Sequence, residues 1–146
     1  MLWPTLAVLL SLTALAVVIV ALQVDDWRRD LTTNTASTSD DPRSALPAHR
    51  SELAPAELAR HVLSVIDKLP RWRLAELTEG DGQVTLHLVR STPLLRFQDD
   101  ITVTISPEPT GSILRATSKS RLGKGDLGQN PRNLRELLSA LQSSRD

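Results

Sequence analysis

The chain begins with an apolar segment that restricts what this end of the protein can form. From Leu2 to Val24 no residue is charged. As a helix this run would extend about 34 Å at 1.5 Å per residue, enough for a hydrocarbon core of roughly 30 Å. Trp3 and Trp27 flank the run, and tryptophan favours the headgroup level of a bilayer. The sequence therefore predicts a transmembrane anchor over residues 1–24 and a single-pass membrane protein, with the lipid bilayer as a partner of residues 2–24.

The flanks of this segment bear on its orientation and its retention. Arg28 and Arg29 follow the segment and no Lys or Arg precedes it, which argues for a cytoplasmic domain by the positive-inside rule. A cleaved signal peptide would instead show a positive N-terminal region, an apolar run of about 7–15 residues and a small-residue cleavage site. None of these is clear in the sequence, so we expect the segment to be retained.

The next segment, residues 25–53, is rich in Thr, Ser, Asp and Pro and has few apolar residues. Such a composition buries too little surface to offset the entropy of ordering the chain. We therefore predict a flexible linker here and an α+β domain over residues 54–146. The chain has no cysteine, which excludes disulfides, a thiol nucleophile and cysteine metal sites.

The domain shows helical periodicity at its two ends and strand periodicity between them. A helix is predicted to begin at Pro55 and to continue to Leu69. Two hairpins follow, with turns at 79–82 and 107–111, and Asn130 is predicted to cap a last helix. We expect a two-layer domain with a four-stranded, mainly antiparallel sheet and two helices against one face. The side chains expected in its core are Leu58, Val62, Ile66, Leu86, Val103, Ile105, Leu134 and Leu138.

Three glycines, Gly123, Gly125 and Gly128, match the GxGxxG pattern of dinucleotide-binding loops. That fold needs a further strand after the helix, and only 18 residues follow Gly128. We interpret the glycines as a turn between a strand and a helix. An alternative is that its backbone N–H groups, with Arg121 and Lys124, hold an anion or a carboxylate of a partner.

Basic residues alternate along the last predicted strand. Arg115, Thr117, Lys119 and Arg121 fall on one face, as a solvated surface or as a site for an anionic headgroup or an acidic partner. The whole chain balances 17 basic against 17 acidic residues. The predicted domain has one Phe, one Trp and no Tyr for stacking bases, which argues against nucleic acid.

Two adjacent acidic residues, Asp99 and Asp100, precede a predicted strand. Their side chains should diverge to opposite faces, so they cannot form a catalytic carboxylate pair. A structural ion pair with Arg96, Arg115 or Arg121 is the favoured interpretation. The three histidines show no spacing typical of a metal site, and we expect no metal and no cofactor.

Two segments, RSTPLLRFQDDITVTI and TSKSRLGKGDLGQNPRNLRELLSAL, carry the patterns RF-x-DD-x-V and S-x-SR-x-G-x-x-D-x-G-x-N. In these patterns the chain resembles the proteins grouped as domain of unknown function 1499, over roughly residues 70–142. The matching positions are Arg96, Phe97, Asp99, Asp100, Val103, Ser118, Ser120, Arg121, Gly123, Asp126, Gly128 and Asn130. A cysteine-containing segment of many relatives, similar to CPxSPNC, is absent here. The resemblance implies an exported or membrane-attached protein, which favours a periplasmic domain, and it implies no reaction, cofactor or catalytic residue.

These observations favour a membrane-anchored, non-catalytic module of the cell envelope that binds a protein partner or an anionic ligand. The alternative is a hydrolase that uses Asp99 or Asp100 with Arg96 and Arg121. We also predict that Asp126 accepts bonds from the backbone or from Arg121 and fixes its loop against Asp99 or Asp100. The candidate binding or structural motif comprises Arg96, Asp99, Asp100, Arg121, Gly123, Asp126, Gly128 and Asn130.

Overall fold

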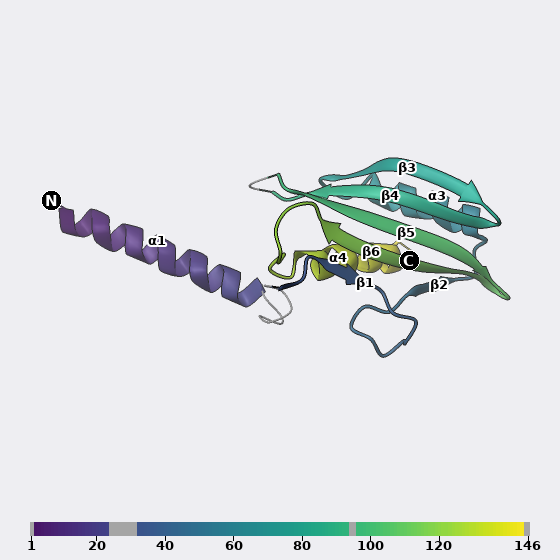
Figure 1. Ribbon diagram of the computed structural model, residues 1–146, viewed down its shortest axis with the longest axis horizontal. Coiled ribbons are helices and arrows are strands. Elements are labelled where there is room, and N and C mark those ends of the chain that lie inside the picture. The colour runs from purple at the N-terminus through teal and green to yellow at the C-terminus, as the bar shows by residue number, and fades with distance from the viewer. Residues whose placement is uncertain (1, 24–31, 94–95, 145–146) are drawn as a thin grey trace.

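A computed structural model describes residues 2–23, 32–93 and 96–144 (Figure 1). Helix α1 comes first, and a sheet with two further helices follows. The helices are α1 (Leu2–Gln23), α3 (Pro55–Ile66) and α4 (Gln129–Ser143). The strands are β1 (Thr35–Ser37), β2 (His49–Ser51), β3 (Trp72–Gly80), β4 (Gln83–Ser91), β5 (Gln98–Glu108) and β6 (Gly111–Ser120).

The six strands form one antiparallel sheet in the order β1-β6-β5-β4-β3, and β2 also pairs with β6. Helices α3 and α4 cover the same face of this sheet (Figure 1). Alternate residues of β5 point toward the helices and are buried, as the period of two in a strand requires. No described helix covers the opposite face of the sheet, which we call the open face.

The predicted core is confirmed, because all eight side chains expected there are buried. Val62 and Ile66 of α3 and Leu134 of α4 belong to the same cluster as Leu86 and Ile105 of the sheet. Pro55 occupies the first turn of α3, where its missing N–H costs nothing. The α+β class and the positions of the two hairpins are therefore as predicted from hydrophobic periodicity and from the turn residues between the strands.

The prediction of a four-stranded sheet is wrong, because the described residues form six strands. The two additional strands, β1 and β2, come from residues 25–53, for which a flexible linker is expected. Thr35 pairs with Lys119, and His49 pairs with Leu114. Three-residue strands bury little surface of their own. Here both are held by backbone pairing with the longer strand β6.

The prediction of a transmembrane anchor over residues 1–24 is also corrected. Crossing a bilayer takes a helix of about 20 consecutive, predominantly apolar residues. Over the described residues, no helix has the length and apolar character to span a membrane. The prediction of a single-pass membrane protein is overturned by the same finding.

Candidate functional site

Most residues of the predicted motif lie where the N-terminal end of α4 meets β5 and β6. Five buried polar side chains form a network there, which we call the polar ring. Three of them come from strands and two from the first turns of α4. The members of the polar ring are Asp99, Ser118, Ser120, Asn130 and Asn133.

The hydrogen bonds of the polar ring close on themselves. Asp99 is 2 % exposed and accepts bonds from the Ser120 hydroxyl at 2.7 Å and the Asn133 amide at 2.8 Å. Asn133 also donates to Ser118 Oγ at 3.1 Å, and Ser118 donates to Asn130 Oδ1 at 2.6 Å. Asn130 completes the ring by donating to Ser120 Oγ at 3.0 Å. Each side chain therefore has its partners inside the protein, which is what makes burial of polar groups tolerable.

Asp126 ties the glycine loop to this ring. Its carboxylate accepts bonds from the backbone N–H of Gly128 at 2.9 Å and of Asn130 at 2.8 Å, and also from the Asn130 side chain. The expected backbone bonds are thus present. Arg121 does not bond to Asp126, and the link to Asp99 runs through the polar ring instead of directly.

The predicted role of Asn130 as the cap of the last helix is wrong. Gly128 holds the cap position with a φ of 76°, and α4 begins at Gln129. Asn130 lies inside the first turn, where its side chain is buried and faces the strands. Its amide also donates to the Asn34 carbonyl at 2.7 Å, so it joins β1 to the helix. Asn130 thus has a structural role, but its side chain bonds to the strands and does not cap the helix.

The GxGxxG glycines form a turn, as interpreted from the sequence. Gly123 has a φ of 90° and Gly128 a φ of 76°, conformations that favour glycine. No strand follows α4 in the described residues, so the loop does not open a dinucleotide-binding unit. The Gly123 carbonyl accepts a bond from the Asn34 side chain at 3.0 Å, which holds the loop beside β1.

Asp100 and Arg121 meet on the open face of the sheet, opposite to the polar ring. Arg121 donates to both carboxylate oxygens of Asp100, at 2.8 and 2.6 Å, and to the Gln98 side chain at 2.5 Å. The divergence of Asp99 and Asp100 and the expected ion pair are therefore both present. A second bidentate pair joins Arg115 to Asp40 at 2.8 and 2.7 Å. Two of the three basic residues in the predicted stripe are thus paired within the domain.

The Asp100–Arg121 pair makes a prediction about acid stability. Hydrogen bonds from Arg121 hold the pKa of Asp100 below its ordinary value of 3.8. A carboxylate with a lowered folded pKa stabilises the protein above its unfolded pKa, and this contribution is lost as the pH falls through the folded pKa. Arg121→Gln should therefore lower stability slightly at pH 7, because both side chains are about half exposed.

Urea unfolding at pH 7 and at pH 2.5 measures this effect, with Arg60→Gln on the exposed face of α3 as the control. The difference between the wild type and Arg121→Gln should shrink in acid and in high salt. An undiminished difference at pH 2.5 would contradict the assignment.

Arg96 lies apart from the polar ring and lines a cavity with two other arginines. This arginine cavity, defined by Arg71, Arg73 and Arg96, has a volume of about 420 Å³. Trp72, Ser91, Thr92 and Pro93 complete its lining. Among the described residues, no carboxylate forms an ion pair with any of the three arginines.

Two of these arginines have an unusual backbone. The φ angle is 68° at Arg71 and 53° at Arg96, in the left-handed region that costs a non-glycine residue about 1 kcal/mol or more. Residues in such conformations cluster at binding sites, where the surrounding structure maintains them. The two left-handed residues therefore mark the arginine cavity as a candidate binding site.

The sequence interpretation missed Arg71, Arg73 and Asn133. Arg71 and Arg73 flank the first residue of β3, and Arg96 lies in the connection from β4 to β5. A hairpin of β3 and β4 brings the start of β3 next to the end of β4. The predicted hairpin therefore already implied that Arg71 and Arg73 lie near the connection that contains Arg96. Asn133 follows Asn130 at a spacing of three, which places both on one face of a helix.

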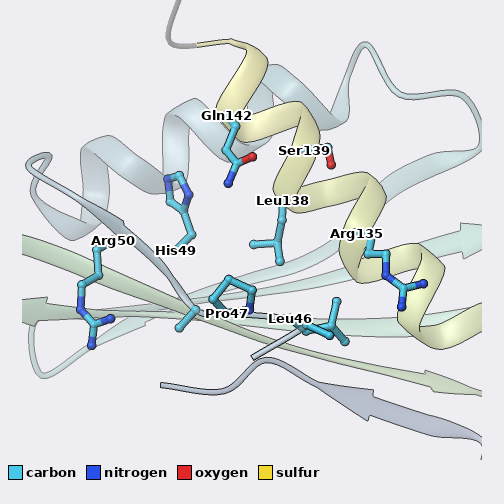
Figure 2. A pocket seen from close by; sticks show the side chains of 10 residues that line it. Leu46, Pro47, His49, Arg50, Arg135, Leu138, Ser139 and Gln142 are labelled. Carbon is cyan, nitrogen blue, oxygen red and sulfur yellow. The ribbon is translucent and has the colours of Figure 1, made fainter. Parts of the chain in front are cut away.

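A second cavity, also of about 420 Å³, lies between α4 and the segment before β2 (Figure 2). His49 and Gln142 point toward one another across it, and Leu138 contributes apolar surface from α4 (Figure 2). Both of its arginines have partners, since Arg50 Nε lies 3.3 Å from Glu108 Oε2 and Arg135 also makes an interaction. This cavity therefore offers less unpaired charge than the arginine cavity.

Comparison with protein families decides which group the chain falls into. The family model described as "Protein of unknown function (DUF1499)" matches residues 25–141. The chain belongs to this family. No curated protein and no solved structure matches the chain.

Membership in DUF1499 confirms the resemblance seen in the two sequence patterns. The match also begins at residue 25, so it includes β1 and β2 as well as the longer strands. In this DUF1499 chain the pattern positions Asp99, Ser118, Ser120 and Asn130 are four of the five members of the polar ring. Packing of α4 on the sheet therefore accounts for these four positions.

The four residues of the hydrolase alternative do not share one site in this DUF1499 domain. Asp99 is buried beneath α4, Asp100 is paired with Arg121 on the open face, and Arg96 lines the arginine cavity. Across the described residues, no group of three or more His, Cys, Asp or Glu side chains is arranged to hold a metal ion.

Proposed function

We propose that this domain is a non-catalytic binding module whose ligand is a phosphate-like anion held in the arginine cavity. The observation that carries the proposal is that three arginines line one cavity and none of them forms an ion pair with a carboxylate of the described residues. Arg73 also acts on the Asp100 carboxylate and helps to lower its pKa, but no described carboxylate lines the cavity itself. Like charges around one cavity repel one another, and an anion would relieve that repulsion. A guanidinium group also offers paired N–H donors that fit two oxygens of a phosphate.

The other residues of the cavity support binding and not chemistry. Ser91 and Thr92 add hydroxyl groups that suit an oxyanion. Among the described residues, the lining contains no carboxylate, histidine or thiol that would serve as a general base or nucleophile. By contrast, Arg115 and Arg121 of the basic stripe are already bonded to Asp40 and Asp100. An anion at the stripe would have to displace these carboxylates, whereas an anion in the arginine cavity would not.

Titration of inorganic phosphate into the full-length protein, followed by calorimetry, tests the proposal. We expect saturable binding that weakens with added salt. Arg71→Gln, Arg73→Gln and Arg96→Gln should each reduce the affinity about fivefold or more, equivalent to ~1 kcal/mol. Arg60→Gln is the matched control, because it removes the same charge from the exposed surface of α3 and should leave the affinity unchanged.

Two results would overturn the proposal. One is the absence of saturable phosphate binding by the wild type. The other is an equal loss of affinity in the three cavity variants and in Arg60→Gln, which would reduce the effect to net charge.

A further inference from the structure

We infer that the anion bound in the arginine cavity is a phosphate monoester that carries an apolar chain, an inference that rests on the proposed function. The reason lies in Phe97 and Leu122, two large apolar side chains at the same end of the sheet. Phe97 is 46 % exposed and Leu122 is 64 % exposed. A monoester would place its phosphate among the arginines and its chain over these two side chains.

Phe97 is fixed directly beside the cavity. Its backbone N–H donates to Thr92 Oγ1 at 3.0 Å, and its carbonyl accepts a bond from the Thr92 backbone at 2.8 Å. Thr92 lines the arginine cavity, and Arg96 immediately precedes Phe97 in the chain. The exposed ring is thus held at the edge of the cavity by two hydrogen bonds to one of its lining residues.

Leu122 reaches the same place from the neighbouring strand. Asp99 of β5 pairs with Ser120 of β6, and the backbone N–H of Arg121 donates to the Gln98 carbonyl at 3.1 Å. The next residues along the two chains are Phe97 and Leu122. The ladder ends at the pair Asp99–Ser120, and the Arg121–Gln98 bond continues its register by one residue. Phe97 and Leu122 come next in that register, which brings the two apolar residues to the same end of the sheet.

The two features together select the ligand class. Charge complementarity with Arg71, Arg73 and Arg96 requires an anionic group, and phosphate satisfies it with several oxygens. An apolar chain that covers Phe97 and Leu122 removes apolar surface from water. Each methylene group buried in this way strengthens binding about fourfold. Inorganic phosphate uses the first feature only, whereas an alkyl phosphate uses both.

Calorimetric titration of the full-length protein with methyl phosphate and with hexyl phosphate tests this inference. Hexyl phosphate should bind at least about tenfold more tightly than methyl phosphate. The double variant Phe97→Ala with Leu122→Ser should lose this advantage and keep its affinity for methyl phosphate. Leu53→Ser, which changes a leucine that is 40 % exposed beside β2, is the matched control and should keep both affinities.

The outcomes separate the two proposals. If neither ester binds, the proposed function fails. If methyl phosphate binds and hexyl phosphate binds no more tightly, or if the double variant retains the advantage, the inference fails and the proposed function stands. Hexanol alone should not saturate the site, and saturable hexanol binding would overturn the requirement for phosphate. Competition by phosphatidic acid in phosphatidylcholine vesicles, measured against hexyl phosphate, distinguishes a lipid monoester from a soluble one.

Discussion

Replacing Gly111 with alanine is expected to lower the free energy of unfolding by about 3 kcal/mol and to detach β2 from the sheet. Gly111 begins β6 with a φ of 103°, a conformation that L side chains rarely adopt. A Cβ atom there would collide with the Ser51 carbonyl and would lie 2.7 Å from the Cα of Glu52. Because these are backbone atoms, β2 must move to make room.

The glycine in the other hairpin provides the control. Gly82 also has a positive φ, 74°, but a Cβ atom at this position would meet nothing within 4 Å. Gly82→Ala should therefore cost only the backbone strain, ~1 kcal/mol. Urea unfolding measures both losses, and hydrogen exchange at Arg50 and Ser51 reports on the detachment of β2. Equal losses in the two variants would show that contact with β2 contributes nothing.

Long periodic elements were predictable from the sequence because they carry their own signal. The alternation of Ile101, Val103 and Ile105 indicates a strand wherever its partners lie, and the same holds for the helix that begins at Pro55. The opposite orientations of Asp99 and Asp100 follow from the period of two in a strand. These inferences need no knowledge of which element packs against which.

Strands β1 and β2 were not predictable, because pairing with β6, and not the pattern of their own side chains, holds these segments in the strand conformation. Ala36 pairs with Ser118 and Arg50 pairs with Ile113, contacts between residues far apart in the sequence. A composition rich in Ser, Thr and Asp indicates a linker when the segment is considered alone. Here the backbone of this segment completes the edge of a sheet, and hydrogen bonding to the β6 backbone does not depend on apolar side chains.

The candidate site also has a part that the sequence predicts and a part that only the structure shows. The spacing of Ser118, Ser120 and Asn130 was visible in the sequence. The ring closes only through Asn133, which donates to Asp99 and to Ser118. Arg96 was selected from a pattern that it shares with Asp99 and Asp100. Its partners in space are Arg71 and Arg73, which lie outside that pattern, because the hairpin of β3 and β4 decides which arginines meet.

Replacing Asn130 with alanine is expected to cost about 3 kcal/mol of stability, because it opens the polar ring. The change leaves the hydroxyl of Ser118 without its acceptor and removes the donor to Ser120, both in buried positions. It also removes the side-chain bond that joins Asp126 to the ring. Such losses exceed the value of a single exposed hydrogen bond, since buried polar groups without partners retain their full desolvation cost.

A double-mutant cycle with Ser118→Ala tests whether the ring acts as a unit. If it does, the two substitutions together should cost less than the sum of the single losses, because the first has already left the second group without its partner. Ser139→Ala on the exposed side of α4 is the control and should be nearly neutral. Additive losses from Asn130→Ala and Ser118→Ala, measured by urea unfolding, would show independent hydrogen bonds. The phosphate affinity of Asn130→Ala should remain that of the wild type wherever the variant is folded, because the polar ring and the arginine cavity share no residue.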